Sequence, residues 1–167
     1  MPILEADTLE FISRSMAQTR RLGARLGFLL RGGDVVALEG DLGSGKTVFA
    51  QGIGRGWGAL SHLLSPTYVL IRRHERSQDK TRLYHIDLYR LNSVEEAIDL
   101  GLEEMLGDQT SVCVIEWADR AAEIMPEESL WVTLRWLDEY RRALTFRPGG
   151  ERHRALLRRY RQEIVGR

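Results

Sequence analysis

The stretch from Val35 to Ala50, VVALEGDLGSGKTVFA, decides the fold. Within it Gly40 is followed by four residues and then by Gly45, Lys46 and Thr47, which is the P-loop pattern without departure. A short apolar run, DVVALEG, precedes the loop and is typical of a buried strand. The residues after it, KTVFAQGIGRGWG, predict a helix that glycines close near position 58. Strand, loop and helix in this order are the context that a phosphate-binding loop requires.

Each residue type in the loop has a mechanical task. The glycines permit positive φ angles and a close approach, so that successive N–H groups can point at a phosphate. The helix that begins at Lys46 adds the positive end of its dipole. The Lys46 ammonium reaches the β- and γ-phosphates, and the Thr47 hydroxyl is placed to hold Mg²⁺. The predicted phosphate-binding set is Asp41, Gly43, Ser44, Gly45, Lys46, Thr47 and Val48.

The use of lysine supports this interpretation. Of 24 basic residues only Lys46 and Lys80 are lysine, and the rest are arginine. A chain that otherwise uses arginine has lysine at the one place where a planar guanidinium would not fit the loop.

A P-loop also needs an acidic residue at the end of a neighbouring buried strand, and two candidates exist. Glu116 follows the uninterrupted apolar run VCVI, as expected of a central parallel strand, whereas the run before Asp87 alternates like a half-exposed hairpin. We therefore prefer Glu116 as the Walker B-like acid. Asp87 is then a switch or supporting residue, or simply a strand-end acid paired with Arg90 or Arg82.

The rest of the chain predicts an α/β domain. Ser15 and Gln18 form a capping box that starts a helix over about 16–30. TYVLIRRHE and TRLYHIDLYR flank a polar turn and predict an antiparallel hairpin. SVEEAIDLGLEEML predicts one helix with Ser93 as its cap, and SVCVIEW a buried central strand. SLWVTLRWLD and YRRALTFRP predict another hairpin, followed by a helix in ERHRALLRRYRQEIV.

These elements predict a P-loop NTPase-like, three-layer α/β domain with a mixed parallel and antiparallel sheet over residues 1–147, followed by a basic helical tail at 148–167. From Arg135 onward the chain carries ten arginines against four acids, while the whole chain has a net charge of zero. Such a tail is either a solvated amphipathic helix that caps the domain or an extra contact to RNA or an acidic partner.

Composition places further bounds on the protein. The single cysteine, Cys113, sits in an apolar run and cannot form an internal disulfide, which favours a reducing compartment and a role in the core. We find no stretch near the ~20 apolar residues of a membrane span and no export signal at the N-terminus. The expectation is a cytoplasmic protein with no membrane partner.

The class of P-loop protein follows in part from what the motifs omit. The one asparagine, Asn92, is followed by Ser93, so the Asn-Lys-x-Asp guanine motif of GTPases is missing. No local pattern announces a kinase acceptor pocket, and the further motifs of helicases are absent. The residues alone thus indicate a small, Mg²⁺-dependent ATP-binding protein.

The ordered set GDLGSGKT, SPTYVL, YHIDLYRL and VIEWADR resembles the TsaE (YjeE) family over about residues 15–145. The resemblance implies an ATPase that hydrolyses ATP slowly and docks on a transferase complex of TsaD and TsaB. That complex makes threonylcarbamoyladenosine next to the anticodon of tRNA. The cofactors would be ATP and Mg²⁺, tRNA would be reached through the complex, and no small-molecule acceptor is expected.

The resemblance also assigns roles to residues. Thr47 and Glu116 would face the magnesium ion, Asp87 would lie close to the γ-phosphate, and Lys46, Asp87 and Glu116 form the expected catalytic set. Trp117 would lie near the nucleotide, although a buried core tryptophan is an equally good interpretation. Residues around Ser15 to Thr19, and Arg141, would border the adenine and phosphates. The expected switch and partner-contact segment is Ser65, Pro66, Thr67 and Tyr68, with Trp117 beside it.

Two other functions stay open at this stage. A stand-alone kinase for a small metabolite predicts brisk turnover that depends on an acceptor and ignores protein partners. A nucleotide-gated RNA-binding module predicts salt-sensitive tRNA affinity that is lost when residues 148–167 are deleted.

Overall fold

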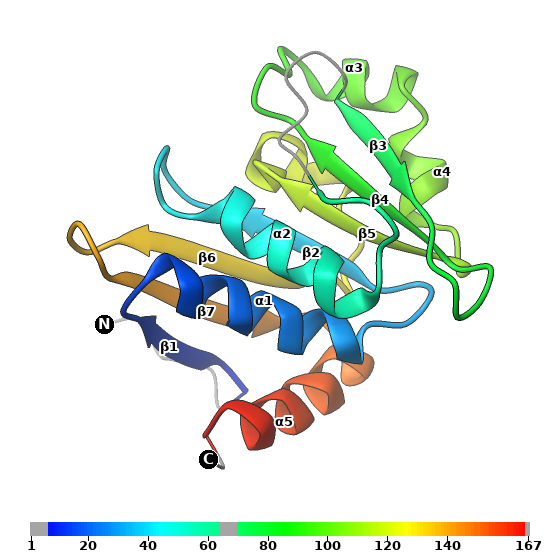
Figure 1. Ribbon diagram of the computed structural model, residues 1–167. Coiled ribbons are helices and arrows are strands. Elements are labelled where there is room, and N and C mark those ends of the chain that lie inside the picture. Colours follow the sequence, from blue (N-terminus) through cyan, green and yellow to red (C-terminus); the bar gives the residue numbers. More distant parts are fainter. Residues whose placement is uncertain (1–6, 64–69, 166–167) are drawn as a thin grey trace.

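The computed structural model describes residues 7–63 and 70–165 of the chain (Figure 1). The strands are β1 (Leu9–Ser13), β2 (Val35–Glu39), β3 (Ile71–His74), β4 (Arg82–Asp87), β5 (Ser111–Glu116), β6 (Leu130–Trp136) and β7 (Arg142–Pro148). The helices are α1 (Met16–Leu29), α2 (Lys46–Trp57), α3 (Val94–Asp99), α4 (Leu102–Leu106), the 3-10 helix η1 (Ala118–Ile124) and α5 (Glu151–Val165). No helix in the described ranges is long and apolar enough to cross a membrane.

In the described residues the strands form one sheet in the order β1-β7-β6-β2-β5-β4-β3. The four central strands, β6, β2, β5 and β4, are parallel, while β1, β7 and β3 join antiparallel at the two edges. The continuous apolar runs of β2 and β5 occupy the centre because both faces of these strands are covered. The mixed sheet predicted from the sequence is confirmed.

Helices cover both faces of the sheet, which gives three layers. One core cluster joins α1, α2 and α5 to alternate residues of the strands, including Val36, Leu38 and Val114. The other joins α3, α4 and η1 to the opposite set, including Ala37 and Ile115. Figure 1 shows α1 and α2 lying across the front of the sheet, with α3 and α4 on the far side.

Helices α1 and α2 touch backbone to backbone. A Cβ atom added at Gly27 of α1 would lie 2.1 Å from the Ile53 carbonyl oxygen, and one added at Gly56 of α2 would lie 1.8 Å from the Ala24 oxygen. No side chain larger than hydrogen fits at these crossings. The glycines of GIGRGWG thus set the distance between the two helices, and this distance places the start of α1 beside the loop after β2.

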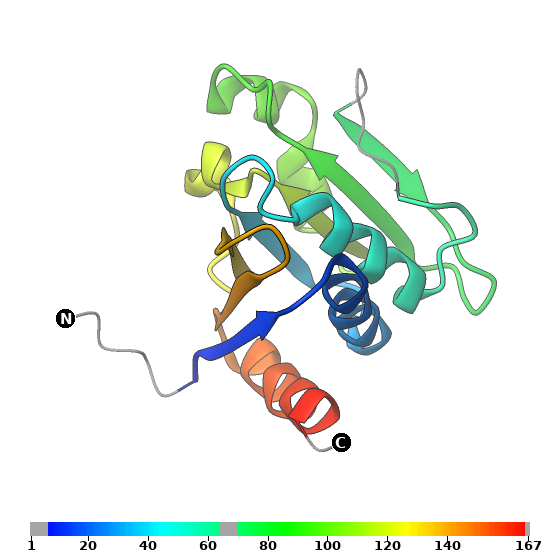
Figure 2. The same cartoon turned by 60° about the vertical axis from the view of Figure 1, so that its left-hand side comes forward.

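Helix α5 packs on the same face as α1, against the β1 and β7 end of the sheet (Figure 2). Tyr160 is fully buried and its hydroxyl donates to the Leu22 carbonyl at 2.8 Å. At the other end of α5, Arg152 donates two hydrogen bonds to the buried Asp34 carboxylate, at 3.2 and 2.8 Å. The apolar face predicted for this helix therefore belongs to the main core.

Three details differ from the sequence prediction. The segment predicted as one helix after Ser93 is two helices, because Gly101 adopts φ 82°, a left-handed conformation that ends α3 and starts α4. Strand β4 is not half-exposed: besides its hairpin with β3 it pairs in parallel with β5, and its last three residues are buried. Strand β1 was not predicted. It is a short edge strand that forms through pairing with distant β7.

Candidate functional site

The loop between β2 and α2 has the backbone conformation expected of a phosphate loop. Gly43 and Gly45 have φ angles of 79° and 100°, in the left-handed region. Gly40 has φ 148°, and a Cβ there would lie 2.2 Å from the Leu134 carbonyl oxygen, so only glycine fits. The first bond of α2 runs from Phe49 N to Gly45 O. The amides of the three preceding residues therefore have no partner within the helix and face the loop.

Lys46 begins α2 and folds back over this loop. Its ammonium donates to the carbonyl oxygens of Gly40 and Asp41 and to Ser44 Oγ. The Nζ atom also lies 4.0 Å from the centre of the Trp117 ring. Burial lowers the pKa of Lys46, against the opposing charges of Glu116 and other nearby acids. A buried ammonium held by loop carbonyls suits an anionic ligand, which would add the charge that these neutral partners do not supply.

The carboxylate of Glu116 joins the loop to the centre of the sheet. Thr47 Oγ1 donates to Glu116 Oε1 at 2.6 Å, and His85 Nε2 lies 2.6 Å from Glu116 Oε2. Glu116 and His85 are fully buried. Strands β2, β5 and β4 run in parallel, so their carboxyl ends meet at one edge, and this topology brings residues 69 positions apart into contact.

Asp87 lies directly beside Glu116 in the register of β4 and β5. Burial raises the pKa of Asp87, although the Tyr89 amide donates to Oδ1 at 2.9 Å, and the charge of Glu116 raises the pKa further. In the described part of the chain Asp87 forms no ion pair with Arg90 or Arg82. Of the interpretations left open for Asp87, pairing with these arginines is therefore not what the structure shows.

Trp117 forms one wall of the site. It has φ 59°, a left-handed conformation that a bulky residue rarely adopts. Its ring contacts Tyr89 with centroids 5.0 Å apart, and the Arg120 guanidinium lies 5.3 Å from the ring centre. Trp117 is partly buried and also packs on the second core cluster, so it serves both as a core residue and as a wall of the cavity.

A cavity of about 480 Å³ opens over the loop. Its walls come from α1, the loop, the ends of β4 and β5, and the β6–β7 hairpin. The lining residues are Met16, Thr19, Leu42, Gly43, Gly45, Lys46, Thr47, Val48, Asp87, Tyr89, Glu116, Trp117, Tyr140 and Arg142.

Some predicted site residues lie elsewhere. Ser15 caps α1 by accepting from Gln18 N, and its neighbours Met16 and Thr19 line the cavity instead. Arg141 is bound to Asp138 within the β6–β7 turn at 2.6 Å, and the next residue, Arg142, faces the cavity. Arg141 lies in the turn, outside β7, whereas Arg142 is the first residue of β7, which explains the difference of one position.

Asp41 and Ser44 do not line the cavity and act on Lys46 from the loop side, Asp41 through its backbone carbonyl. The predicted switch segment, Ser65 to Tyr68, lies outside the described residues.

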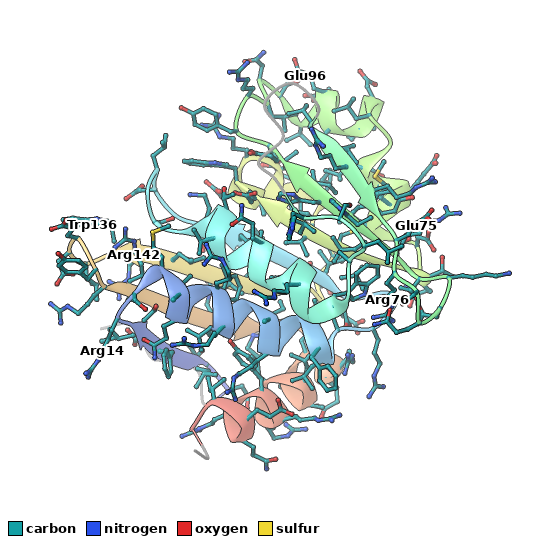
Figure 3. All side chains as sticks on the ribbon, in the orientation of Figure 1. Arg14, Glu75, Arg76, Glu96, Trp136 and Arg142 are labelled. Carbon is teal, nitrogen blue, oxygen red and sulfur yellow. The ribbon has the colours of Figure 1, made fainter. Side chains whose placement is uncertain are left out.

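Two side chains of the site were not predicted from the sequence. Arg142 donates from Nε to the Gly43 carbonyl at 3.1 Å and so contacts the loop itself. His85 contacts the carboxylate of Glu116 from the neighbouring strand. The sequence YHIDLYRL contained a clue to His85, because this histidine lies two residues before Asp87 and therefore on the same face of the strand. Figure 3 shows Arg142 a short way in from Trp136 at the hairpin tip.

This geometry fits a nucleotide with a divalent cation. Loop amides and Lys46 suit phosphate oxygens, while the Thr47 hydroxyl and the carboxylates of Glu116 and Asp87 are the oxygen donors that Mg²⁺ prefers. Comparison with known proteins agrees with such a site. The family model of the threonylcarbamoyl adenosine biosynthesis protein TsaE matches residues 13–144. The chain belongs to the TsaE family.

Curated members of the TsaE family are similar over most of their length. The tRNA threonylcarbamoyladenosine biosynthesis protein TsaE of Treponema pallidum is 40% identical over 134 residues, which are 80% of this chain and 96% of the relative. The TsaE protein of Streptomyces coelicolor is 44% identical over 112 residues, 66% of this chain and 74% of the relative. The crystal structure of YdiB from Bacillus subtilis superposes with a TM-score of 0.72 at 27% identity, covering 93% of this chain and 95% of YdiB.

Proposed function

We propose that this TsaE family member binds ATP with Mg²⁺, hydrolyses it slowly, and thereby drives or resets a TsaB and TsaD transferase complex that forms threonylcarbamoyladenosine in tRNA. One observation carries the proposal: Lys46, Thr47 and Glu116 converge on a single cavity over a glycine loop, with Thr47 Oγ1 2.6 Å from Glu116 Oε1. The family membership supports the pathway.

The residues divide the work of binding. The loop amides and the Lys46 ammonium would hold the β- and γ-phosphates. Thr47 Oγ1 and Glu116 would hold the magnesium ion, which supplies charge neutralisation on the phosphate oxygens when bound. Arg142 would fix the loop from the opposite strand through its bond to Gly43 O. Together these contacts position the terminal phosphate at the carboxyl ends of β4 and β5.

Asp87 is the residue we propose to orient the attacking water. It faces the cavity beside Glu116, and its raised pKa makes its carboxylate a better proton acceptor than an exposed aspartate. The two cations among the lining residues, Lys46 and Arg142, already contact loop carbonyls. Slow turnover is then expected for the isolated chain, because a further positive group from a partner would speed charge neutralisation in the transition state.

Exposed apolar residues at the mouth of the cavity support the proposal of a protein partner. Leu42 at the tip of the loop is 71% exposed, and Tyr140 in the β6–β7 turn is 69% exposed. Met16, which lines the cavity, and Trp136, which pairs with the lining residue Arg142, add further exposed apolar surface. Exposed apolar residues gathered at a ligand site are typical of a protein interaction surface. A partner seated there would contact the nucleotide site directly, so nucleotide state and docking would be coupled.

Phosphate release from ATP tests the proposal. The purified protein is measured alone, and then with the TsaD and TsaB proteins of the same organism and unmodified tRNA. Slow basal release that rises with the partners and falls in the Glu116→Ala variant is the expected result. Rapid ADP formation that ignores the partners and depends on an added small-molecule acceptor, with the phosphate transferred to the acceptor instead of released, would refute it in favour of a kinase.

A further inference from the structure

A buried histidine stands behind the proposed magnesium site, and neither the P-loop pattern nor the proposed mechanism uses it. His85 is fully buried in β4, and its Nε2 atom lies 2.6 Å from Glu116 Oε2. An ionised carboxylate can only accept, so His85 Nε2 donates in this bond. Glu116 thus has a donor on each oxygen, Thr47 on Oε1 and His85 on Oε2.

We propose that His85 is a positioning residue for the magnesium site, one that fixes the Glu116 carboxylate so that its Oε1 atom meets Thr47. The inference rests on the proposed function for its consequence, and on the observed hydrogen bonds for its geometry. The terminal torsion of a glutamate side chain is broad and weakly restrained. Two donors on opposite oxygens therefore define the carboxylate plane in a way that one donor does not.

Burial makes the second donor necessary. Glu116 is 1% exposed, and a carboxylate removed from water is strongly destabilised unless hydrogen bonds replace its hydration. In the described residues the side-chain partners of Glu116 are Thr47 and His85. If a cation binds Oε1 and the Thr47 hydroxyl, the hydrogen bond from His85 to Oε2 remains. Groups that orient metal ligands in this way typically change metal affinity or activity 10- to 100-fold when removed.

A simple core role does not explain His85. Leu83, His85 and Asp87 lie on one face of β4, and these side chains change from apolar to polar toward the cavity. Leucine at position 85 would pack in this core but would leave Glu116 Oε2 without its donor. Among these three residues, His85 is the one in hydrogen-bond contact with that oxygen.

The neighbouring strand offers a matched control. His74 in β3 is also buried, and diagonal pairing places it near His85 on the same face of the sheet. Its Nδ1 atom is 2.9 Å from Ser61 Oγ, so this ring is bound to the segment after α2 and not to Glu116. Leucine substitution at either position removes one buried imidazole of the same sheet face, and only one of the two contacts the carboxylate.

The test compares His85→Leu, His85→Gln and His74→Leu. ATP affinity is titrated in EDTA and then in Mg²⁺, and folding is checked by thermal unfolding. We expect His85→Leu to keep its affinity in EDTA and to need at least about 10-fold more Mg²⁺ for the same gain in affinity. His85→Gln, whose amide nitrogen can replace Nε2 as a donor, should restore most of the gain. His74→Leu should show the wild-type magnesium dependence.

Equal losses in His85→Leu and His74→Leu, or a loss already present in EDTA, would overturn the inference, because either result indicates a general effect on the core. A wild-type protein that shows no magnesium dependence at all would count against the proposed function instead. In that case crystal structures decide about His85. A His85→Leu structure in which Thr47 Oγ1 still contacts Glu116 Oε1 as in the wild type would refute the positioning role.

Discussion

Thr47 and Glu116 lie 69 positions apart in the sequence and share a hydrogen bond of 2.6 Å between Oγ1 and Oε1. The bond joins the first turn of α2 to the last residue of β5. In this arrangement the Thr47 hydroxyl uses its proton toward Glu116, so its lone pairs remain available to a cation.

Removing the Thr47 hydroxyl tests the proposed cation site. Thr47→Val keeps the branched shape but removes the oxygen, so we expect the magnesium-dependent part of ATP affinity to fall about 10-fold or more, with little change in EDTA. Thr47→Ser keeps the hydroxyl and should stay within a few-fold of the wild type. Equal binding by both variants in Mg²⁺ would remove Thr47 from the site. Isothermal titration with and without Mg²⁺ measures the difference.

Lys46 should be indispensable for turnover. Lys46→Ala removes the buried ammonium over the loop, and we expect ATP hydrolysis to fall by about 100-fold or more because a positive charge that would stabilise the transition state is lost. Lys80→Ala is the natural control, since Lys80 is exposed in the turn between β3 and β4. Single-turnover phosphate release is the measurement. An active Lys46→Ala variant would contradict the site assignment.

The crossing of α1 and α2 predicts a large loss of stability from a small substitution. Gly56→Ala should favour the isolated helix, yet its Cβ would lie 1.8 Å from the Ala24 carbonyl oxygen. The helices must separate, so we expect unfolding free energy to fall by about 2–3 kcal/mol or more, as for overpacked cores. Gly107→Ala, whose Cβ would meet nothing within 3.4 Å, should change it by less than about 1 kcal/mol. Urea unfolding separates the two, and equal effects would refute the close contact.

The environment of Asp34 predicts how low pH affects the stability that the contact between Asp34 and α5 provides. Burial opposes ionisation of Asp34, but His153, whose Nε2 lies 3.3 Å from Oδ1, and hydrogen bonds from Arg152 and the Arg31 amide outweigh burial and lower its pKa from 3.8. The folded state thus binds its proton less readily than the unfolded state. The stabilisation is present above the ordinary aspartate pKa and is lost as pH falls through the lowered value.

Asp34→Asn should therefore cost about 3 kcal/mol of unfolding free energy at neutral pH, because Arg152 loses a buried partner. The difference from the wild type should shrink below about pH 4, where the native carboxyl also becomes protonated. Asp99→Asn, at an exposed position in α3, should change stability by less than about 0.5 kcal/mol. Denaturant unfolding at several pH values measures both. A pH-independent difference for Asp34→Asn would contradict the role of its charge.

The sequence by itself determined the unit from β2 to α2. Its strand, loop and helix are contiguous between Val35 and Trp57. The spacing of residues from Gly40 to Thr47 is enough to predict the conformation of the loop, because that conformation depends on local backbone geometry. The uninterrupted apolar run before Glu116 likewise predicted the central strand β5, because a strand covered on both faces needs no polar alternation.

Only the tertiary structure decided which side chains meet. Pairing between β4 and β5 buried the alternating run before Asp87 and placed His85 against Glu116, and no local pattern reports the partner of a strand. Arg142 rather than Arg141 faces the cavity because Arg142 is paired with Trp136 at the start of β7, while Arg141 stays in the turn, bound to Asp138. Local spacing is recorded in the chain residue by residue. Contacts between distant strands depend on the order of the strands in the sheet, and the site lies where those strands end.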